Sequence, residues 1–222
     1  MCIRDSNEVG AYQQAEHALR DALAAAERMG LYNVVATAKN NLGIALARQG
    51  KLEEANAVET EAIIDSAKQG DRRMEGGSRH YLATILELQG SLEEAEREAQ
   101  RSAELLLIAP PLRAHVLATL ARIRLAQGRT GESLATAREA MEELDKLGGL
   151  EEGEAVVRLV HAEALSASGQ DEEAQRAVDE AKARLLARAE KIQDSNWRDS
   201  FLQNVPENAR TLALASDAPE PE

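Results

Sequence analysis

Residues 46–55, with the sequence LARQGKLEEA, decide the fold of this chain, because residues 86–95 repeat them as LELQGSLEEA. In both copies an apolar helix end runs into a Gly, and an Ala follows five residues later. Gly ends a helix readily because the left-handed backbone conformation costs it least. A small residue in the first turn of the next helix lets two antiparallel helices approach closely. The two segments therefore predict helix pairs joined by tight turns.

The same turn recurs along the chain at a nearly constant interval. The glycines that anchor it are Gly10, Gly50, Gly90, Gly128 and Gly169. Their spacings of 40, 40, 38 and 41 residues indicate a repeat of about 40 residues, which is typical of a stacked array of helix pairs. The fold class predicted is therefore all-α, an α-solenoid of antiparallel helix pairs.

The glycines also set the register of the expected helices. We expect a leading helix at 10–29 that lacks the first helix of its own pair. Four complete pairs should follow, at 31–48 with 51–69, 72–88 with 91–108, 111–127 with 131–147, and 150–168 with 170–193. Because the leading helix lacks one partner, we expect its Leu19 and Leu23 to lie on an exposed face.

Composition excludes several classes of protein. Of 222 residues, 44% are hydrophobic and 2% aromatic, and no apolar run approaches the roughly 18 residues that span a membrane. The net charge of −13 repels a phosphate backbone, so we expect neither nucleic acid nor a membrane as a partner. Cys2 is the only cysteine, which argues against disulfides and thiolate metal sites. A cytoplasmic location is therefore expected.

The segment Leu42-Gly43, followed by Gly50 and Ala55, resembles the central positions of the tetratricopeptide repeat (TPR), a helix-turn-helix unit. The resemblance covers roughly residues 10–193 and implies a TPR-like solenoid. The period is about six residues longer than the usual 34, and most of the usual aromatic residues are replaced. Lys39, Arg79 and Leu117 stand where a Trp is usual, and Leu46 and Leu86 where a Tyr is usual. A HEAT-like array or another α-solenoid is the alternative, although it would not predict the Gly-to-Ala spacing.

Both ends of the chain differ from the repeats. Residues 1–6, MCIRDS, resemble a translated sequencing adapter, so we interpret them as an artefact and 7–193 as the repeat domain. Residues 194–215 predict capping helices, in which Trp197 and Phe201 lie four residues apart and can bury together against the last repeat. Residues 216–222, with two Pro and three acids, predict a disordered tail.

The stretch at residues 197–212 resembles the end of TPR regions in large bacterial signalling proteins. In those proteins a serine/threonine kinase or an AAA-type ATPase module precedes the repeats. The resemblance implies a longer parent protein, with an upstream module that the repeats contact within the same chain.

The residues that carry catalytic chemistry are almost absent. We find no Gly-rich phosphate loop and no nucleophile elbow, so we do not expect an enzyme. The four histidines are spread over different repeats without metal-ligand spacing, so we expect no metal and no cofactor. They are His17, His80, His115 and His161.

Stacked helix pairs leave an inner surface lined by the first helix of each pair, which can hold a peptide or a helix of another protein. We therefore predict a protein-protein interaction scaffold with a protein or peptide partner. By the repeat register, the candidate residues of the concave surface are Asn40, His80, Thr84, Arg122 and Glu163. The alternative is a small-molecule-sensing solenoid that regulates an upstream kinase or ATPase module, which would need a concave apolar pocket.

Overall fold

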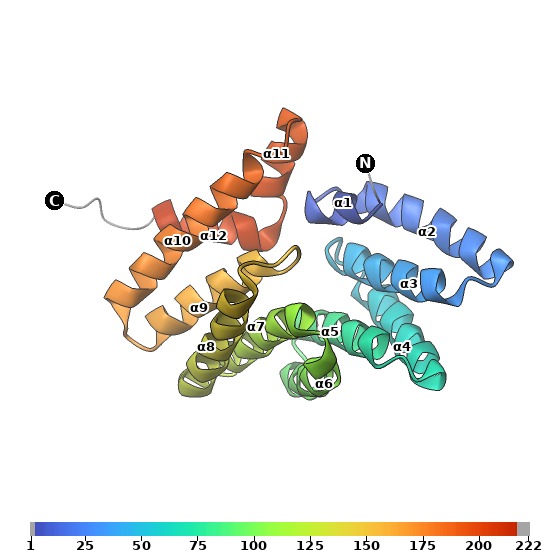
Figure 1. Ribbon diagram of the computed structural model, residues 1–222, viewed down its shortest axis with the longest axis horizontal. Coiled ribbons are helices and arrows are strands. Elements are labelled where there is room, and N and C mark those ends of the chain that lie inside the picture. The colour runs from blue at the N-terminus through green and yellow to red at the C-terminus, as the bar shows by residue number, and fades with distance from the viewer. Residues whose placement is uncertain (1–2, 217–222) are drawn as a thin grey trace.

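The computed structural model describes residues 3–216, and within that range it contains twelve α-helices, one short 3-10 helix and no strand (Figure 1). The helices are α1 (Ile3–Glu8), α2 (Tyr12–Met29), α3 (Tyr32–Ala47), α4 (Leu52–Gln69), α5 (Arg72–Leu88), α6 (Leu92–Leu105), η1 (Leu106–Ile108), α7 (Pro110–Ala126), α8 (Thr130–Leu147), α9 (Glu154–Ala167), α10 (Asp171–Ala189), α11 (Ser195–Gln203) and α12 (Pro206–Ser216). The prediction of an all-α solenoid is confirmed.

Each helix pair is joined by the turn that the sequence repeats. At the first complete pair, Gly50 has a φ of 77°, and the amide of Lys51 donates to the carbonyl of Leu46 at 3.0 Å. This closes the end of α3 in the manner of a glycine C-cap. Five residues later Ala55 is fully buried in the first turn of α4, where it packs between Leu42 and Leu46 of α3. The turn thus sets both the direction of the second helix and its close approach to the first.

The expected helix boundaries agree with the structure to within a few residues, with two larger differences. Helix α9 begins at Glu154 rather than at residue 150, because residues 148–153 form a loop instead of a first turn. Gly153 has a φ of 83° and lies so close to His115 that a Cβ atom there would be 2.7 Å from His115 Cδ2. Helix α10 ends at Ala189 rather than at 193.

The expectation that the leading helix would expose an apolar face is wrong. Leu19 is only 3% exposed, because it packs against α3 and α4 in one cluster with Leu42 and Leu46. Leu23 is half-buried at the edge of this cluster. A helix in this array therefore buries its apolar face against the pair that follows it, and α2 does not depend on a preceding helix for that contact.

The two ends of the chain are described in part. Residues 3–6 belong to α1, while Met1 and Cys2 lie outside the described residues, so the adapter interpretation of residues 1–6 stays a prediction. At the other end, Ser216 is the last residue of α12, and the rest of the expected tail, 217–222, lies outside the described residues.

The two C-terminal helices pack on the last pair, since α11 contacts α10 and α12 contacts α9 and α10, and the two aromatic residues of α11 differ in burial. Asp194 accepts a hydrogen bond from the amide of Trp197 at 3.1 Å, which is an N-cap of α11. Phe201 is buried with Leu185 and Val205, whereas Trp197 is half-buried and lies outside that cluster. Phe201, with the partly buried Leu202 beside it, therefore anchors α11 to α10.

A buried carboxyl group lies in the interface between α3 and α4. Glu59 is 0% exposed, and neither of its carboxyl oxygens has a hydrogen-bond partner. Burial raises the pKa of Glu59 well above its ordinary value, which favours the protonated, uncharged form. It fits only because residue 43 is a Gly: a Cβ atom at that position would lie 2.8 Å from Glu59 Cδ. Gly43 and Glu59 are thus a sterically matched pair.

We expect Gly43→Ala to reduce the free energy of unfolding by about 1–3 kcal/mol, because the added methyl group overlaps the Glu59 carboxyl. In a Glu59→Ala background the same change should be neutral or stabilising, since Ala favours a helix by about 1 kcal/mol over Gly. Urea unfolding of the four proteins of this double-mutant cycle measures the coupling. Gly131→Ala on α8, where the added Cβ meets open space, is the control and should not couple to Glu59. A coupling near zero between positions 43 and 59 would contradict the pairing.

The pH dependence of stability should also reveal Glu59. The unfolded chain ionises this group near its ordinary pKa of 4.5, whereas the folded protein keeps it protonated to a higher pH. The stability that Glu59 contributes is therefore fully present below pH 4.5 and is lost as pH rises toward its folded-state pKa. We expect the wild type to lose stability relative to Glu59→Gln by up to about 1.4 kcal/mol per pH unit from pH 5 upward. Parallel pH curves of the two proteins would show that Glu59 is ionised in the folded state.

Candidate functional site

The inner side of the solenoid encloses a cavity of about 420 Å³. Side chains from both halves of the chain line it, because the helices curve round until the last ones approach the first ones (Figure 1). The elements that contribute are α1, α2, α3, α5, α7, α9, α10, α11, α12 and the loop at 148–153. We refer to this space as the central cavity.

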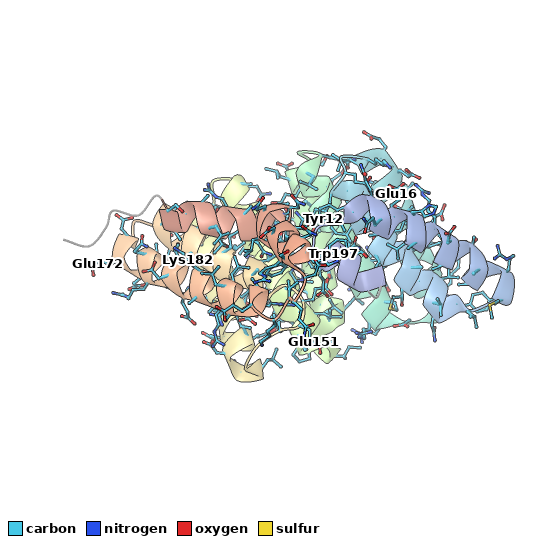
Figure 2. All side chains as sticks on the ribbon, turned by 90° about the horizontal axis from the view of Figure 1, so that it is seen from above. Tyr12, Glu16, Glu151, Glu172, Lys182 and Trp197 are labelled. Atoms are coloured by element: carbon cyan, nitrogen blue, oxygen red, sulfur yellow. The ribbon has the colours of Figure 1, made fainter. Side chains whose placement is uncertain are left out.

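The central cavity is closed where the two ends of the solenoid meet, at a contact that we call the seam. Ser200 of α11 donates a hydrogen bond to the carbonyl of Val9 at 2.6 Å, and Arg48 at the end of α3 binds Glu207 of α12 at 2.9 Å. Gly10 permits the approach, since a Cβ atom there would lie 2.8 Å from Asn204 Cβ. Figure 2 shows Tyr12 of α2 and Trp197 of α11 in this part of the molecule. The seam is mostly polar, with Val9 as its apolar contact to the α10–α11 cluster.

Three of the five residues predicted for the concave surface line the central cavity, namely His80, Thr84 and Arg122. The other two are used in packing. Asn40 accepts a hydrogen bond from Ser78 at 2.6 Å between α3 and α5, and Glu163 on α9 binds Arg210 of α12 at 3.0 Å.

Sequence reasoning missed the cavity residues that lie outside the first helix of each pair. These residues reach the cavity only because the two ends of the solenoid meet at the seam. The charged and amide members of this set are Asn7, Glu8, Glu151, Glu152, Arg184, Arg188, Lys191, Glu207 and Asn208. No local pattern signals them.

Two neutral histidines lie side by side in the cavity wall. The rings of His80 and His115 meet edge to face with centroids 4.4 Å apart, and Nε2 of His80 lies 2.9 Å from Thr119 Oγ1. Burial lowers the pKa of both histidines, so each is uncharged at neutral pH. Beside them, burial raises the pKa of Tyr12 to about 12, which keeps its hydroxyl protonated. These groups offer hydrogen bonds rather than charge.

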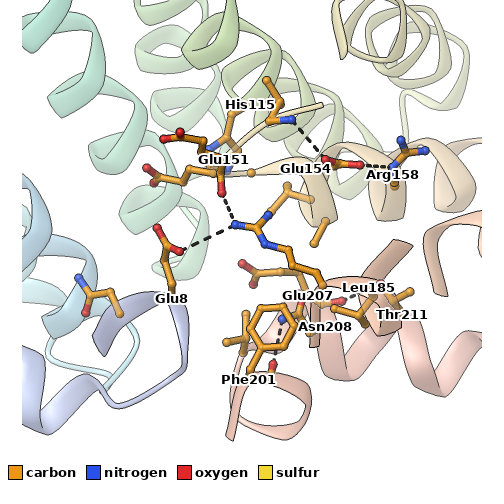
Figure 3. Close-up of a pocket in the computed structure, with 18 of the residues that line it drawn as sticks. Glu8, His115, Glu151, Glu154, Arg158, Leu185, Phe201, Glu207, Asn208 and Thr211 are labelled. Atoms are coloured by element: carbon orange, nitrogen blue, oxygen red, sulfur yellow. Dashed lines mark hydrogen bonds and ion pairs between the residues drawn. The ribbon is translucent and has the colours of Figure 1, made fainter. Parts of the chain in front are cut away.

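The charged groups of the cavity wall are mostly paired. Arg122 binds Glu87 of the neighbouring helix through Nε at 2.8 Å and Nη2 at 2.7 Å. Arg158 binds Glu154 at 2.8 Å, and this pair lies at the start of α9 (Figure 3). The hydroxyl of Tyr81 donates to Glu152 at 2.6 Å, which ties the loop to α5. These pairs hold the wall in place.

Arg188 of α10 crosses the seam. Its guanidinium lies 3.8 Å from the carboxylate of Glu8 on α1 and donates a hydrogen bond to the main-chain carbonyl of Glu151, as the dashed lines in Figure 3 indicate. One side chain thus joins the last repeat, the first helix and the loop.

Among residues 3–216 no group of three or more His, Cys, Asp or Glu side chains could hold a metal ion. The two histidines are neutral, and neither is hydrogen-bonded to a carboxylate that could make it a base. In the same part of the chain, no helix is long and apolar enough to cross a membrane.

No known protein family and no curated protein matches this chain. It does resemble solved structures. A set of nearly identical TPR-like repeats from Podosopora anserina is 20% identical, covers 86% of this chain and 94% of that one, and has a TM-score of 0.58. A Rap protein complexed with Competence and Sporulation Factor is 13% identical, covers 96% of this chain but 60% of that one, and has a TM-score of 0.66. YrrB, a TPR protein with an unusual peptide-binding site, is 14% identical over 88% and 91% of the two chains, with a TM-score of 0.51.

At these identities the likeness shows the fold alone. The fold is a TPR-like solenoid, as the Gly-to-Ala spacing predicts, despite the longer period and the missing aromatic residues.

We expect the seam to contribute to stability through Arg48 and Glu207, which are both less than one-fifth exposed. Arg48→Glu and Glu207→Arg should each reduce the free energy of unfolding by about 1 kcal/mol, and the double reversal should recover most of the loss. Hydrogen exchange of α1, α11 and α12 should rise in the single variants only. Reversal of the exposed pair Arg101 and Glu104 on α6 is the control, with a change below about 0.5 kcal/mol. Single reversals without effect would show that the seam does not depend on this pair.

Proposed function

We propose that this chain is a non-catalytic protein-protein interaction scaffold that binds a peptide segment of its partner in the central cavity. The observation that carries the proposal is the convergence of side chains from nine helices on that one cavity. The wall combines apolar groups, such as Ile44 and Val156, with neutral hydrogen-bonding groups, such as His80 and Thr84. A peptide needs this combination, because it presents both side chains and main-chain polar groups.

The structural neighbours support the peptide as the partner. YrrB is a TPR protein with a peptide-binding site, and the Rap protein is complexed with Competence and Sporulation Factor. We also propose that the chain is the repeat region of a larger cytoplasmic bacterial signalling protein and contacts an upstream kinase or ATPase module. The resemblance of residues 197–212 to the ends of such repeat regions is the support for this context.

A second function, the sensing of a small molecule that regulates such a module, is favoured by the size of the cavity. Ligand pockets commonly have volumes of roughly 300–1,000 Å³, and the central cavity of about 420 Å³ falls within that range. A short peptide segment also fits such a volume, whereas a folded partner does not. The two candidates therefore share one site and differ in what occupies it.

A phage-displayed library of random heptapeptides tests the first candidate, with affinities of selected peptides measured by calorimetry. Thr84→Trp and Ile44→Trp each fill part of the cavity, and we expect either to weaken binding by about tenfold or more. Thr60→Trp, on the exposed face of α4, is the matched control and should leave binding unchanged. Circular dichroism checks that each variant keeps its helical content.

Equal affinity of the two cavity variants and the parent protein would contradict binding in the central cavity. A library that yields no binder, together with a metabolite mixture that raises the melting temperature of the parent but not of Thr84→Trp, would favour the second candidate. Turnover of ATP by the purified protein would contradict the non-catalytic assignment.

A further inference from the structure

Three cations line the central cavity at the end of α10. Arg184 and Arg188 lie four residues apart on one face of the helix, and Lys191 lies in the turn that follows it. The whole chain carries a net charge of −13, so three cations that line the central cavity run against the overall charge. Among the described residues, the side chains of Arg184 and Lys191 make no hydrogen bond and no ion pair.

The acidic groups near these cations are already bound elsewhere. Glu207 binds Arg48 at 2.9 Å, Glu154 binds Arg158 at 2.8 Å, and Glu152 accepts the Tyr81 hydroxyl. Glu8 lies 3.8 Å from Arg188, at the long end of an ion pair, and Glu154 adds an electrostatic interaction with Arg184. Because no carboxylate among the described residues is ion-paired to Arg184 or Lys191, these two cations have capacity for a carboxylate from a partner.

Two buried amide oxygens in the same cavity lack a hydrogen-bond donor. Asn208 of α12 is 1% exposed; its Nδ2 donates to the carbonyl of Phe201 at 2.8 Å, while its Oδ1 has no partner. Asn7 of α1 repeats this arrangement, with Nδ2 bound to the carbonyl of Asn41 at 2.9 Å and Oδ1 without a partner. Since both Nδ2 atoms bind carbonyls, the orientation of each amide is fixed. Buried acceptors of this kind call for N–H donors, which the main chain of a peptide provides.

From the unpaired cations and the unpaired acceptors together, we infer that the central cavity takes a short acidic peptide segment. Its carboxylates bind Arg184, Arg188 and Lys191, and its main-chain amides donate to the oxygens of Asn7 and Asn208. This inference rests on the proposed function and names the chemistry of the peptide. It also implies that a bound carboxylate competes with Glu8 for Arg188, because that ion pair is the weakest one of the seam.

The test uses three hexapeptides with blocked ends, in which Ala alternates with Glu, Gln or Lys. Binding to the full chain is followed by amide chemical shifts in nuclear magnetic resonance, which detect weak complexes and place them in the structure. We expect the Glu peptide to bind about tenfold more tightly than the Gln peptide, and the Lys peptide not to bind. Replacement of one main-chain amide of the Glu peptide at a time by an ester should weaken binding at one or more positions, because an N–H donor is lost.

Two variants and one control locate the effect. Arg184→Gln with Lys191→Gln should remove the preference for Glu over Gln, and Glu8→Gln should increase affinity for the Glu peptide by about threefold. Arg73→Gln with Lys146→Gln changes the net charge equally on exposed surfaces outside the cavity, and should leave the preference intact.

The outcomes separate this inference from the proposed function. If the Gln peptide binds as well as the Glu peptide, or if the control pair acts like the pair of Arg184 and Lys191, the acidic preference is wrong while peptide binding stands. If none of the three peptides shifts cavity resonances but library-selected peptides do, the inference is again overturned alone. If no peptide of either kind reaches the cavity, both fail.

Discussion

The rest of the structure depends on one constraint, the close contact of two antiparallel helices across a turn that ends in a left-handed Gly. At Gly50 the chain reverses within four residues, and Ala55 then sits fully buried against the preceding helix. Repetition of this unit at intervals of about 40 residues turns each pair by a similar amount relative to the last. The curvature that results brings α11 and α12 back to α1 and α3, and so creates the central cavity. A local backbone preference thus determines where distant side chains meet.

Features encoded within a few residues could be predicted from the sequence. The five anchoring glycines predicted the element order and most helix boundaries. The late start of α9 was missed. Gly148, Gly149 and Gly153 all have positive φ in the loop that replaces the first turn, and Gly153 there meets His115, a contact between segments that lie far apart in the sequence. The burial of Leu19 was missed for a related reason: an isolated helix pattern shows that an apolar face exists but not which neighbour covers it.

In the candidate site, too, the locally encoded residues were predicted and those that depend on distant contacts were not. The repeat register placed His80, Thr84 and Arg122 on the inner surface, since that assignment needs only the period of the helices. It also included Asn40 and Glu163, which have the right phase but are used to join neighbouring helices. The positions of the cavity residues on α10 and α12 depend on the rotation between successive helix pairs, summed over the whole array. A small error in the rotation assumed for each pair therefore moves these residues away from the cavity. Local sequence patterns therefore do not predict that the two ends of the solenoid meet, nor which residues this contact adds to the site.

The seam changes how the array is connected. An open row of repeats has two free ends, and each terminal unit is held by a single neighbour. Here Ser200 of α11 binds Val9, which follows α1, and Glu207 of α12 binds Arg48 at the end of α3, so the last two helices contact the beginning of the array as well. Every unit then has a neighbour on both sides. The array should therefore tolerate circular permutation: a chain that began at the Gly90 turn, with its present ends joined by a linker, would keep the contacts of the seam.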